Sequence, residues 1–351
     1  MVNFNRGGFM RDSFFESGEN AAVYPTLCKK ISVEYVVLGG SLCAALTAYY
    51  LNQAKKSVAL LAPDVIGGDG TQYLLPRADV SGYYYEKSKI ILNELDQIGE
   101  DFFKRDLFFF SDRKRHEKRL RSFAEAVNGD FYTSEKACEK FSFDVCAGVY
   151  AKNCSAVLNP VKTAKSLAAA ISLSGGFVFE KSPVKDIQNI GGYFIPTAKG
   201  EIFAEKIADC REVLFDKNEY GLTPYICCSF DAEDIEGWHE KCSLSDCYKK
   251  SLSFCFFKDK IYAAAAVSTI SSLSRFYINY KSIWIRDVFE KMFFCSNLYK
   301  PSTLFLTYGK TLVHGEPVIK KIDKNYYSSL CPFENGIISS VITAKEFVKM
   351  Y

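Results

Sequence analysis

The residues of this chain that are best suited to chemistry are small ones in a turn. Residues 35–38 form a short apolar run typical of a buried strand, and the turn after it contains Gly39, Ser41 and Ala44. These occupy the three positions of the dinucleotide fingerprint, which serve a tight turn, close approach of the backbone to a pyrophosphate, and helix–strand packing. Glycine remains only at the first position. Alanine is an accepted substitute at the third, and the Ser41 hydroxyl offers a donor to a phosphate.

The elements around this turn have the order of a βαβ unit. Leu42, Leu46 and Tyr49 recur at helical spacing, and residues 57–62 form a second apolar run. An acidic residue is expected at the end of that second strand, where it binds ribose hydroxyls, but the chain has Ala62. The lost hydrogen bond to a charged group corresponds to about 1.5–3 kcal/mol, or roughly tenfold to a hundredfold in affinity.

No second catalytic pattern stands out in the sequence. There are no paired carboxylates, no Ser/His/Asp spacing and no Walker loop, so hydrolysis and phosphoryl transfer have no support. His314 is the most interesting titratable residue, although a lone histidine in a loop is more often structural. Arg77 follows a Gly-rich loop and is a candidate for binding a substrate carboxylate, with a plain surface role favoured over it. The catalytic residues are not predicted.

The 13 cysteines have neither the spacing of a metal site nor that of a disulfide framework. Cys227 and Cys228 are adjacent, Cys242 and Cys247 have no matching second pair, and others lie in apolar runs. The first residues are not those of a signal peptide. We therefore expect free thiols, no metal and a cytoplasmic protein, with Cys331 as a buried thiol.

Composition excludes several partners. A net charge of +3 over 351 residues is too small to indicate binding to nucleic acid, and the basic cluster at 113–121 is predicted to be a solvated helix face. The longest apolar stretch, residues 36–51, is too short to span a membrane and is broken by Gly39-Gly40. We expect no nucleic acid and no membrane. The oligomeric state is not indicated.

Periodicity beyond the second strand predicts further elements. Helical spacing dominates residues 84–127, although the run 108–110 is best explained as a core strand. A helix is predicted after Asn159-Pro160, ending at Gly175-Gly176, and a strand over residues 177–180. Gly191-Gly192 predicts a hairpin between residues 183–187 and 193–197, and a helix over 337–348 closes the chain.

Together these segments resemble the FAD-dependent oxidoreductases of the D-amino-acid-oxidase (glycine oxidase-like) superfamily. The similarity spans nearly the whole chain and is one of pattern more than of identity. It is carried by the N-terminal lead, the fingerprint turn, the loop after the second strand, the middle strands and two late loops. These are residues 13–16, 24–27, 36–51, 56–68, 158–160, 184–204, 315–319 and 335–337.

The resemblance implies an α/β fold with two domains. A discontinuous, Rossmann-like FAD-binding domain would comprise residues 1–75, 155–210 and 305–351, and an α+β substrate domain on an antiparallel sheet would comprise residues 76–154 and 211–304. It also implies oxidation of an amine or amino-acid-like small molecule by hydride transfer to the flavin N5. The implied cofactor contacts, with the backbone of Val184 against the adenine, are Gly39, Gly40, Ser41, Leu42, Ala62, Pro63, Gly68, Thr71, Val184, Asn335, Gly336 and Ile337.

The chain departs from the family pattern at several cofactor positions. Besides Ser41 and Ala62, residues 210–212 (Cys-Arg-Glu) stand where the family has small residues, His314 replaces an aspartate, and Glu334 precedes the Asn-Gly loop. Two functions therefore compete. One is an FAD-dependent oxidoreductase, and the other is a degenerate member with weakened or lost FAD that acts as a binding or scaffold protein. A third interpretation keeps a different nucleotide or metabolite in the same crevice.

Overall fold

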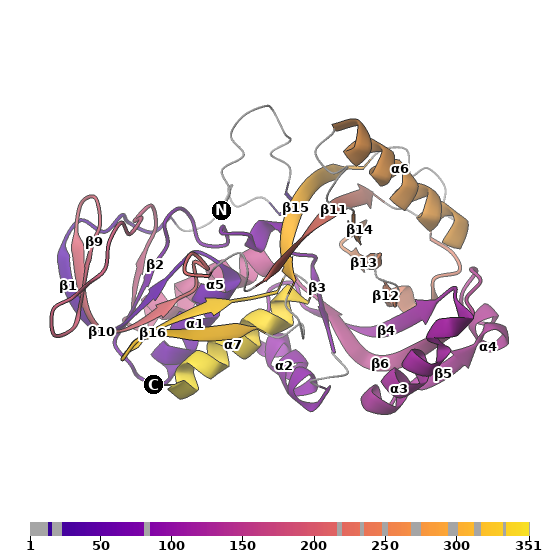
Figure 1. Ribbon diagram of the computed structural model, residues 1–351, viewed down its shortest axis with the longest axis horizontal. Coiled ribbons are helices and arrows are strands. Elements are labelled where there is room, and N and C mark those ends of the chain that lie inside the picture. Colours follow the sequence, from indigo (N-terminus) through magenta and orange to yellow (C-terminus); the bar gives the residue numbers. More distant parts are fainter. Residues whose placement is uncertain are drawn as a thin grey trace. The chain divides into compact units, whose positions relative to one another are not determined.

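The chain folds into two compact units in a computed structural model. The first unit comprises Met1–Phe14, Leu75–Leu158 and Leu222–Gly309, and the second comprises Phe15–Leu74, Asn159–Gly221 and Lys310–Tyr351. Figure 1 shows the elements of both, coloured along the sequence. The structure describes residues 13–15, 23–80, 85–215, 220–231, 235–247, 252–267, 275–293, 301–311, 317–332 and 335–350.

The second unit is built on a mostly parallel sheet with the strand order β16-β17-β10-β1-β2-β7. β1 pairs in parallel with both β10 and β2, while β10 pairs in parallel with β17, and β2 with β7. The predicted βαβ unit is therefore confirmed. The strands are β1 (Lys30–Leu38), β2 (Val58–Leu61), β7 (Phe177–Phe179), β8 (Gln188–Asn189), β9 (Tyr193–Pro196), β10 (Glu201–Asp209), β16 (Val318–Asp323) and β17 (Tyr326–Leu330).

The α-helices among the described residues of this unit are α1 (Leu42–Gln53), α5 (Pro160–Leu173) and α7 (Gly336–Met350). α1 packs against both α5 and α7, which explains why most of its side chains are buried. Asn159 begins α5 by accepting hydrogen bonds from the N–H groups of Val161 (3.1 Å) and Lys162 (3.0 Å), with proline at the first helical position. The apolar side chains of β1, β2 and β10 form one continuous core cluster.

The first unit contains a larger sheet, which curves strongly in Figure 1, with the order β15-β11-β14-β13-β12-β4-β6-β3. Most of the pairings are antiparallel as expected, but β12 and β4 pair in parallel. The strands are β3 (Arg77–Asp79), β4 (Phe103–Ser111), β5 (Asp130–Thr133), β6 (Ala147–Val157), β11 (Gly221–Asp231), β12 (Ser243–Asp246), β13 (Ser253–Phe257), β14 (Lys260–Ala266) and β15 (Thr303–Thr311). The helices are α2 (Tyr85–Ile98), α3 (Glu117–Val127), α4 (Ser134–Cys138) and α6 (Arg275–Met292).

Aromatic side chains pack on both faces of this sheet at β4. Phe108 stacks on Phe141 with ring centroids 4.2 Å apart, in the same core cluster as Phe289 of α6. The next residue, Phe109, packs on Phe123 of α3 from the opposite face. The alternation confirms the prediction that the run 108–110 is a core strand.

Two elements differ from the prediction. The helical stretch expected over residues 84–127 is two helices, α2 and α3, separated by β4, because cross-strand pairing with β6 outweighs the local periodicity there. The hairpin at Gly191-Gly192 joins β9 to β8 (Gln188–Asn189), not to residues 183–187. On α3, Leu120 is buried while its basic neighbours are exposed, which confirms a solvated helix face. None of the helices in the described part of the chain has the length and apolar character to cross a membrane.

Candidate functional site

The carboxyl ends of the parallel strands converge around the fingerprint turn of the second unit. β1 lies between β2 and β10, so the chain leaves β1 at a point where the strand order reverses, the place where ligands bind in open α/β sheets. Gly39 has φ +128°, a conformation that side chains rarely adopt, and its N–H donates to the Leu61 carbonyl at 3.0 Å. The first glycine of the fingerprint is therefore required by the turn itself.

The second residue of the turn, Gly40, is held by the loop that follows β2. A Cβ at Gly40 would lie 2.6 Å from the Val65 carbonyl oxygen, and the Gly40 carbonyl accepts a hydrogen bond from the Gly67 N–H at 2.8 Å. The Gly40 N–H donates to the Asp69 carboxylate at 2.7 Å. Asp69 thus places a negative charge on a backbone donor of the predicted pyrophosphate turn. Sequence reasoning did not single it out, although an acidic residue between Gly68 and Gly70 in this loop is the signal that was available.

Two further N–H groups at the start of α1 have side-chain partners within the chain. The Leu42 N–H donates to the hydroxyl of Thr71 at 2.8 Å, and the Ala44 N–H donates to the Ser41 hydroxyl at 3.3 Å. Ser41 is therefore the N-cap of α1. Thr71 is 2% exposed. Its hydrogen bond with the Leu42 N–H brings two of the predicted contact residues directly together.

Asp69 is half-buried, and its surroundings act on the pKa of its carboxyl group in opposite directions. Burial raises its pKa above the ordinary value and Asp64 raises it further, while the hydrogen bond from Gly40 and the charge of Arg211 lower it; the net shift is upward. The ionised form is therefore disfavoured relative to a solvated aspartate.

Ala62 and Gly68 lie in the loop that follows β2, the same loop that contains Asp69. Ala62 is fully buried; its N–H donates to the Phe179 carbonyl at 2.9 Å, and its own carbonyl accepts from the Ser182 N–H at 3.0 Å. A Cβ at Gly68 would lie 2.9 Å from the Val65 oxygen. Pro63 is half-buried in the same loop.

A buried carboxylate that sequence analysis did not single out accepts a backbone hydrogen bond from this loop. Glu180 follows β7 and is 4% exposed. Its carboxylate accepts the Ile66 N–H at 2.8 Å and the Tyr24 N–H at 3.1 Å. Glu180 therefore ties the N-terminal lead and the loop after β2 to one another, with each oxygen used once.

Charged residues occupy the end of β10, where the family pattern has small ones. Asp209 is fully buried and accepts two bonds from the Arg211 side chain, Nε at 2.9 Å and Nη2 at 2.7 Å, and one from the Arg211 backbone N–H at 3.0 Å. It also accepts the Tyr326 hydroxyl at 2.9 Å. Burial lowers the pKa of Arg211, but the bonds to Asp209 outweigh it and the net shift is upward. Burial, and then the nearby Asp209, raise the pKa of Tyr326. Glu212 accepts the Cys331 N–H at 2.9 Å.

The remaining predicted contacts lie at the start of α7 and beside β7. Asn335 has φ +54° and its carbonyl accepts the Ser339 N–H, so it is the residue from which α7 begins. A Cβ at Gly336 would lie 2.7 Å from the Leu74 side chain, and Ile337 is fully buried. Val184 is half-buried against the core of the parallel sheet. His314 and Glu334 lie outside the described residues.

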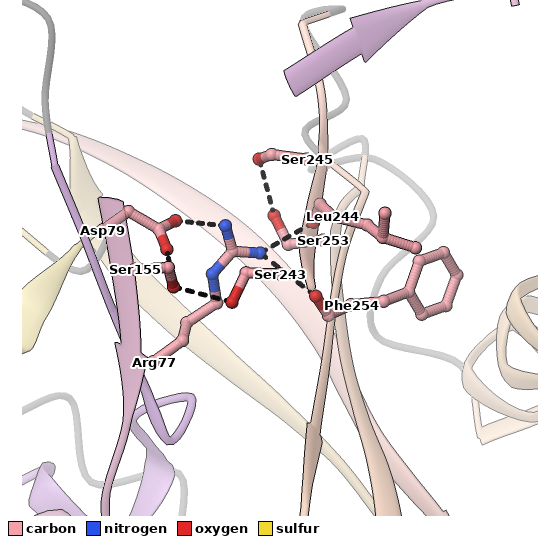
Figure 2. Close-up of polar contacts among 8 residues, drawn as sticks. All are labelled: Arg77, Asp79, Ser155, Ser243, Leu244, Ser245, Ser253 and Phe254. Carbon is pink, nitrogen blue, oxygen red and sulfur yellow. Dashed lines mark hydrogen bonds and ion pairs between the residues drawn. The ribbon is translucent and has the colours of Figure 1, made fainter. Parts of the chain in front are cut away.

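Arg77 in the first unit is not a surface residue, so the favoured interpretation of it was wrong. It is 6% exposed, and its Nη1 donates to the Leu244 carbonyl at 2.8 Å. Its Nη2 is paired with Asp79, whose second oxygen accepts the Ser155 hydroxyl at 2.7 Å. Figure 2 shows the guanidinium directed into this cluster from β3, with Ser243 completing it. Because its donors are bonded inside the sheet, Arg77 is not poised to bind a substrate carboxylate.

The two histidines that the structure describes, His116 and His239, each lie beside a polar side chain. His116 shares a hydrogen bond of 2.8 Å with the Ser111 hydroxyl. His239 lies 3.0 Å from Lys140, and burial followed by that positive charge lowers its pKa. In the part of the chain that the structure describes, no group of three or more metal-ligating side chains is assembled.

The site fits a dinucleotide in backbone shape, with one conflict of charge. The turn at Gly39, the close approach at Gly40 and the amino end of α1 are formed as a pyrophosphate site requires. The conflict is Asp69, which must rotate away before an anion can reach the Gly40 N–H. Asp69 is half-buried and stands between two glycines, Gly68 and Gly70, in the loop after β2.

Solved structures with the same fold are numerous, although their sequences are distant. L-proline dehydrogenase from P. horikoshii superposes with a TM-score of 0.73 at 14% identity, covering 93% of this chain and 94% of its own. Glycine oxidase from Bacillus cereus has a TM-score of 0.69 at 12% identity, covering 91% and 94%. L-alpha-glycerophosphate oxidase from Mycoplasma pneumoniae, solved with FAD bound, has a TM-score of 0.69 at 12% identity, also covering 91% and 94%. These identities establish the fold alone.

Sequence comparison supplies the family. No curated protein sequence matches the chain. The model of the FAD dependent oxidoreductase (DAO) family matches residues 34–214, which run from β1 through α1, β2, α5 and β10 and make up just over half of the 351 residues. The chain therefore belongs to the DAO family of FAD dependent oxidoreductases.

Proposed function

We propose that this protein is an FAD-dependent oxidoreductase that oxidises an amine or amino-acid-like small molecule and holds its cofactor weakly. The observation that carries the proposal is the intact turn between β1 and α1, with Gly39 at φ +128° and Gly40 packed against Val65. A chain that had only kept the fold would not need this backbone geometry, because an ordinary β–α turn would join the two elements.

The comparisons support the substrate class by analogy. Among the structures with this fold are a glycine oxidase, an L-proline dehydrogenase and L-amino acid deaminases, so proteins of this architecture act on amino acids. We extend that class to this chain. We also propose that the second unit is the FAD-binding domain and the first the substrate domain. The twelve described cysteines are all free, which favours the cytoplasm as the compartment.

FAD bound at this site would supply the acceptor for a hydride, which carries the two electrons of the oxidation. The chain's own residues position it. Gly39 and Gly40 let the backbone come close to the pyrophosphate, and the amino end of α1 provides a favourable field for its charge. The Arg211 guanidinium, fixed by Asp209 at the end of β10, adds a positive charge that already acts on Asp69. The start of α7 at Asn335 supplies a second helix terminus.

A direct test is the flavin content of the purified chain. We expect recombinant protein to show partial flavin absorption as purified, and to rise in melting temperature when FAD is added. Gly40→Val is the matched negative variant, because its side chain would collide with the Val65 carbonyl. Colourless protein whose melting temperature does not respond to FAD would refute the oxidoreductase proposal.

A second candidate function is a degenerate family member that binds a partner or ligand without flavin. The observation that favours it is the Asp69 carboxylate at 2.7 Å from the Gly40 N–H, together with Ala62 in place of the ribose-binding acid. If neither the natural chain nor Asp69→Asn binds FAD, this second candidate replaces the first. If only Asp69→Asn binds it, the site is a flavin site closed by its own side chain.

A further inference from the structure

One helix of the first unit presents a concentration of positive charge to solvent. Residues 113–121 contain six lysines and arginines and one carboxylate, that of Glu117, which gives the segment a net charge of +5. The whole chain has a net charge of only +3, so the remaining residues together carry −2. The positive charge is therefore a local feature of this helix, which the small net charge of the chain conceals.

The structure separates a paired part of this segment from a part that carries cations only. The Arg121 side chain is paired with Glu117 at 2.7 Å, and Glu125 follows one turn beyond Arg121. The cations of the other part begin in the 3₁₀ turn Lys114–His116, which leads directly into α3. All four are exposed, and we call them the basic strip: Lys114, Arg115, Lys118 and Arg119.

The basic strip costs the helix stability. Lys114 and Lys118, and likewise Arg115 and Arg119, have the i, i+4 spacing at which like charges repel. Lys118 and Arg119 also lie in the first turn of α3, where the field of the helix favours negative charge. The Arg119 Nη1 donates to the Cys247 carbonyl at 3.1 Å, a neutral partner that leaves the charge in place. An external surface of negative charge would relieve both penalties.

The shape of the surface limits what that partner can be. Leu120, Ala124 and Val127 are buried along the length of α3, which packs on β5 and β6 (Figure 1). Only a shallow, exposed strip of the helix is therefore available for binding. A helix that reads a duplex must project far enough to enter the major groove, and α3 is held against its own sheet.

No apolar or aromatic platform accompanies the basic strip. The Arg121 guanidinium lies 3.9 Å from the centroid of the Phe131 ring, and Phe109 packs on Phe123 with ring centroids 4.8 Å apart. Among residues 104–172, all of which the structure describes, no large hydrophobic side chain is exposed. Stacking of unpaired bases and the apolar centre of a stable protein–protein interface both require such side chains.

We propose that the basic strip is a docking surface for membranes that contain anionic lipids. A plane of negative headgroups matches a shallow strip of cations, and this contact needs neither a groove nor an apolar anchor. Docking is peripheral, since none of the described helices can cross a membrane. The expectation of no membrane rested on the net charge of the whole chain, which does not record where the charge lies. Each cation near such a surface contributes about fivefold to binding, so the four together contribute roughly several hundredfold.

The test is sedimentation of the full chain with lipid vesicles at low salt. One set of vesicles is pure phosphatidylcholine, and in the other about one third of the lipid is phosphatidylserine. We expect the chain to sediment with the second set only, and to be released when the salt concentration is raised to about 0.5 M.

Matched variants assign the binding to the basic strip. Lys114→Gln/Lys118→Gln should weaken binding to the anionic vesicles about 25-fold. Its melting temperature should be equal to or slightly above that of the natural chain, because a repulsive pair is removed. The control is Lys181→Gln/Lys185→Gln, which removes two exposed lysines at the same spacing from the second unit and should bind like the natural chain.

Three results would overturn the proposal. The first is equal sedimentation of the natural chain with the two sets of vesicles, and the second is an equal loss of binding in Lys181→Gln/Lys185→Gln. The third is binding of duplex DNA or single-stranded RNA by a chain that does not bind the anionic vesicles, which would assign the basic strip to nucleic acid. None of these readouts depends on FAD.

Discussion

Neutralising Asp69 should strengthen FAD binding. The carboxylate accepts the Gly40 N–H at 2.7 Å, so a phosphate oxygen bound to the same donor would lie within about 4 Å of it, where two unit charges repel by about 4 kcal/mol at an effective dielectric constant near 20. Asp69 is half-buried on a loop and can rotate into solvent, which reduces the repulsion that is felt. We expect Asp69→Asn to gain about 1–2 kcal/mol, which is about fivefold to thirtyfold in the dissociation constant.

The assay is a titration of FAD fluorescence against the natural chain, Asp69→Asn and Asp64→Asn. Asp64 is the matched control, because it is an exposed carboxylate five residues away in the same loop, whereas the carboxylate that accepts the Gly40 N–H is that of Asp69. Asp69→Asn should bind FAD more tightly at neutral pH, and Asp64→Asn should resemble the natural chain. Unchanged or weaker binding by Asp69→Asn, or an equal gain from Asp64→Asn, would refute the reasoning.

The same carboxyl group predicts a pH dependence with a definite sign. Because the folded pKa of Asp69 is raised, the folded chain holds more protons than the unfolded chain just above the ordinary aspartate pKa. This group therefore favours the folded state below its raised pKa and loses that contribution as the pH rises through it. Since the protonated form has no charge to repel a phosphate, FAD affinity should increase as the pH falls through the same window. Asp69→Asn should remove this dependence, with Asp64 and Arg211 as the charges that remain nearby.

Two further predictions concern stability. Arg77→Met should cost about 3–5 kcal/mol in urea unfolding, because it leaves the half-buried Asp79 carboxylate without its cation and removes the bond to the Leu244 carbonyl. The double variant Arg77→Met/Asp79→Leu should lose less, and an equal or larger loss would contradict an ion-pair origin. Gly40→Ala should cost about 1–3 kcal/mol, because its Cβ would lie 2.6 Å from the Val65 oxygen. Gly70→Ala, where no heavy atom lies within 4 Å but φ is +94°, should lose only about 1 kcal/mol, and an equal effect of the two would argue against the collision.

Much of the fold could be predicted because its signals are local. The apolar run before Gly39, the helical spacing of Leu42 and Leu46, and the proline and glycines around α5 each describe one element and its ends, and the structure has those elements. The family resemblance then supplied the α/β class. The boundary errors, such as β4 inside a stretch of helical spacing, arose where pairing with a distant strand decided the conformation.

The site could be predicted only in part, for the same reason. Sequence reasoning located the turn but not the partner of Gly40, because Asp69 is 29 residues away and reaches it through the loop after β2. Arg77 was expected at the surface, but its carbonyl partners lie 167 and 177 residues further along the chain. Hydrogen bonds over such separations depend on strand order and register, which one-dimensional periodicity does not contain.

The sequence by itself determined the βαβ unit with its glycine turn, because turn conformation and strand or helix periodicity depend on residues next to one another. It also determined that the family's small residues are replaced at the end of β10. Only the tertiary structure decided what the replacements do: Arg211 pairs with the buried Asp209, which also accepts a hydrogen bond from Tyr326, and the sulfur of Cys210 lies 3.9 Å from the sulfur of Cys43. The physical reason is that parallel strands bring their carboxyl ends to one edge, whatever their separation in the chain.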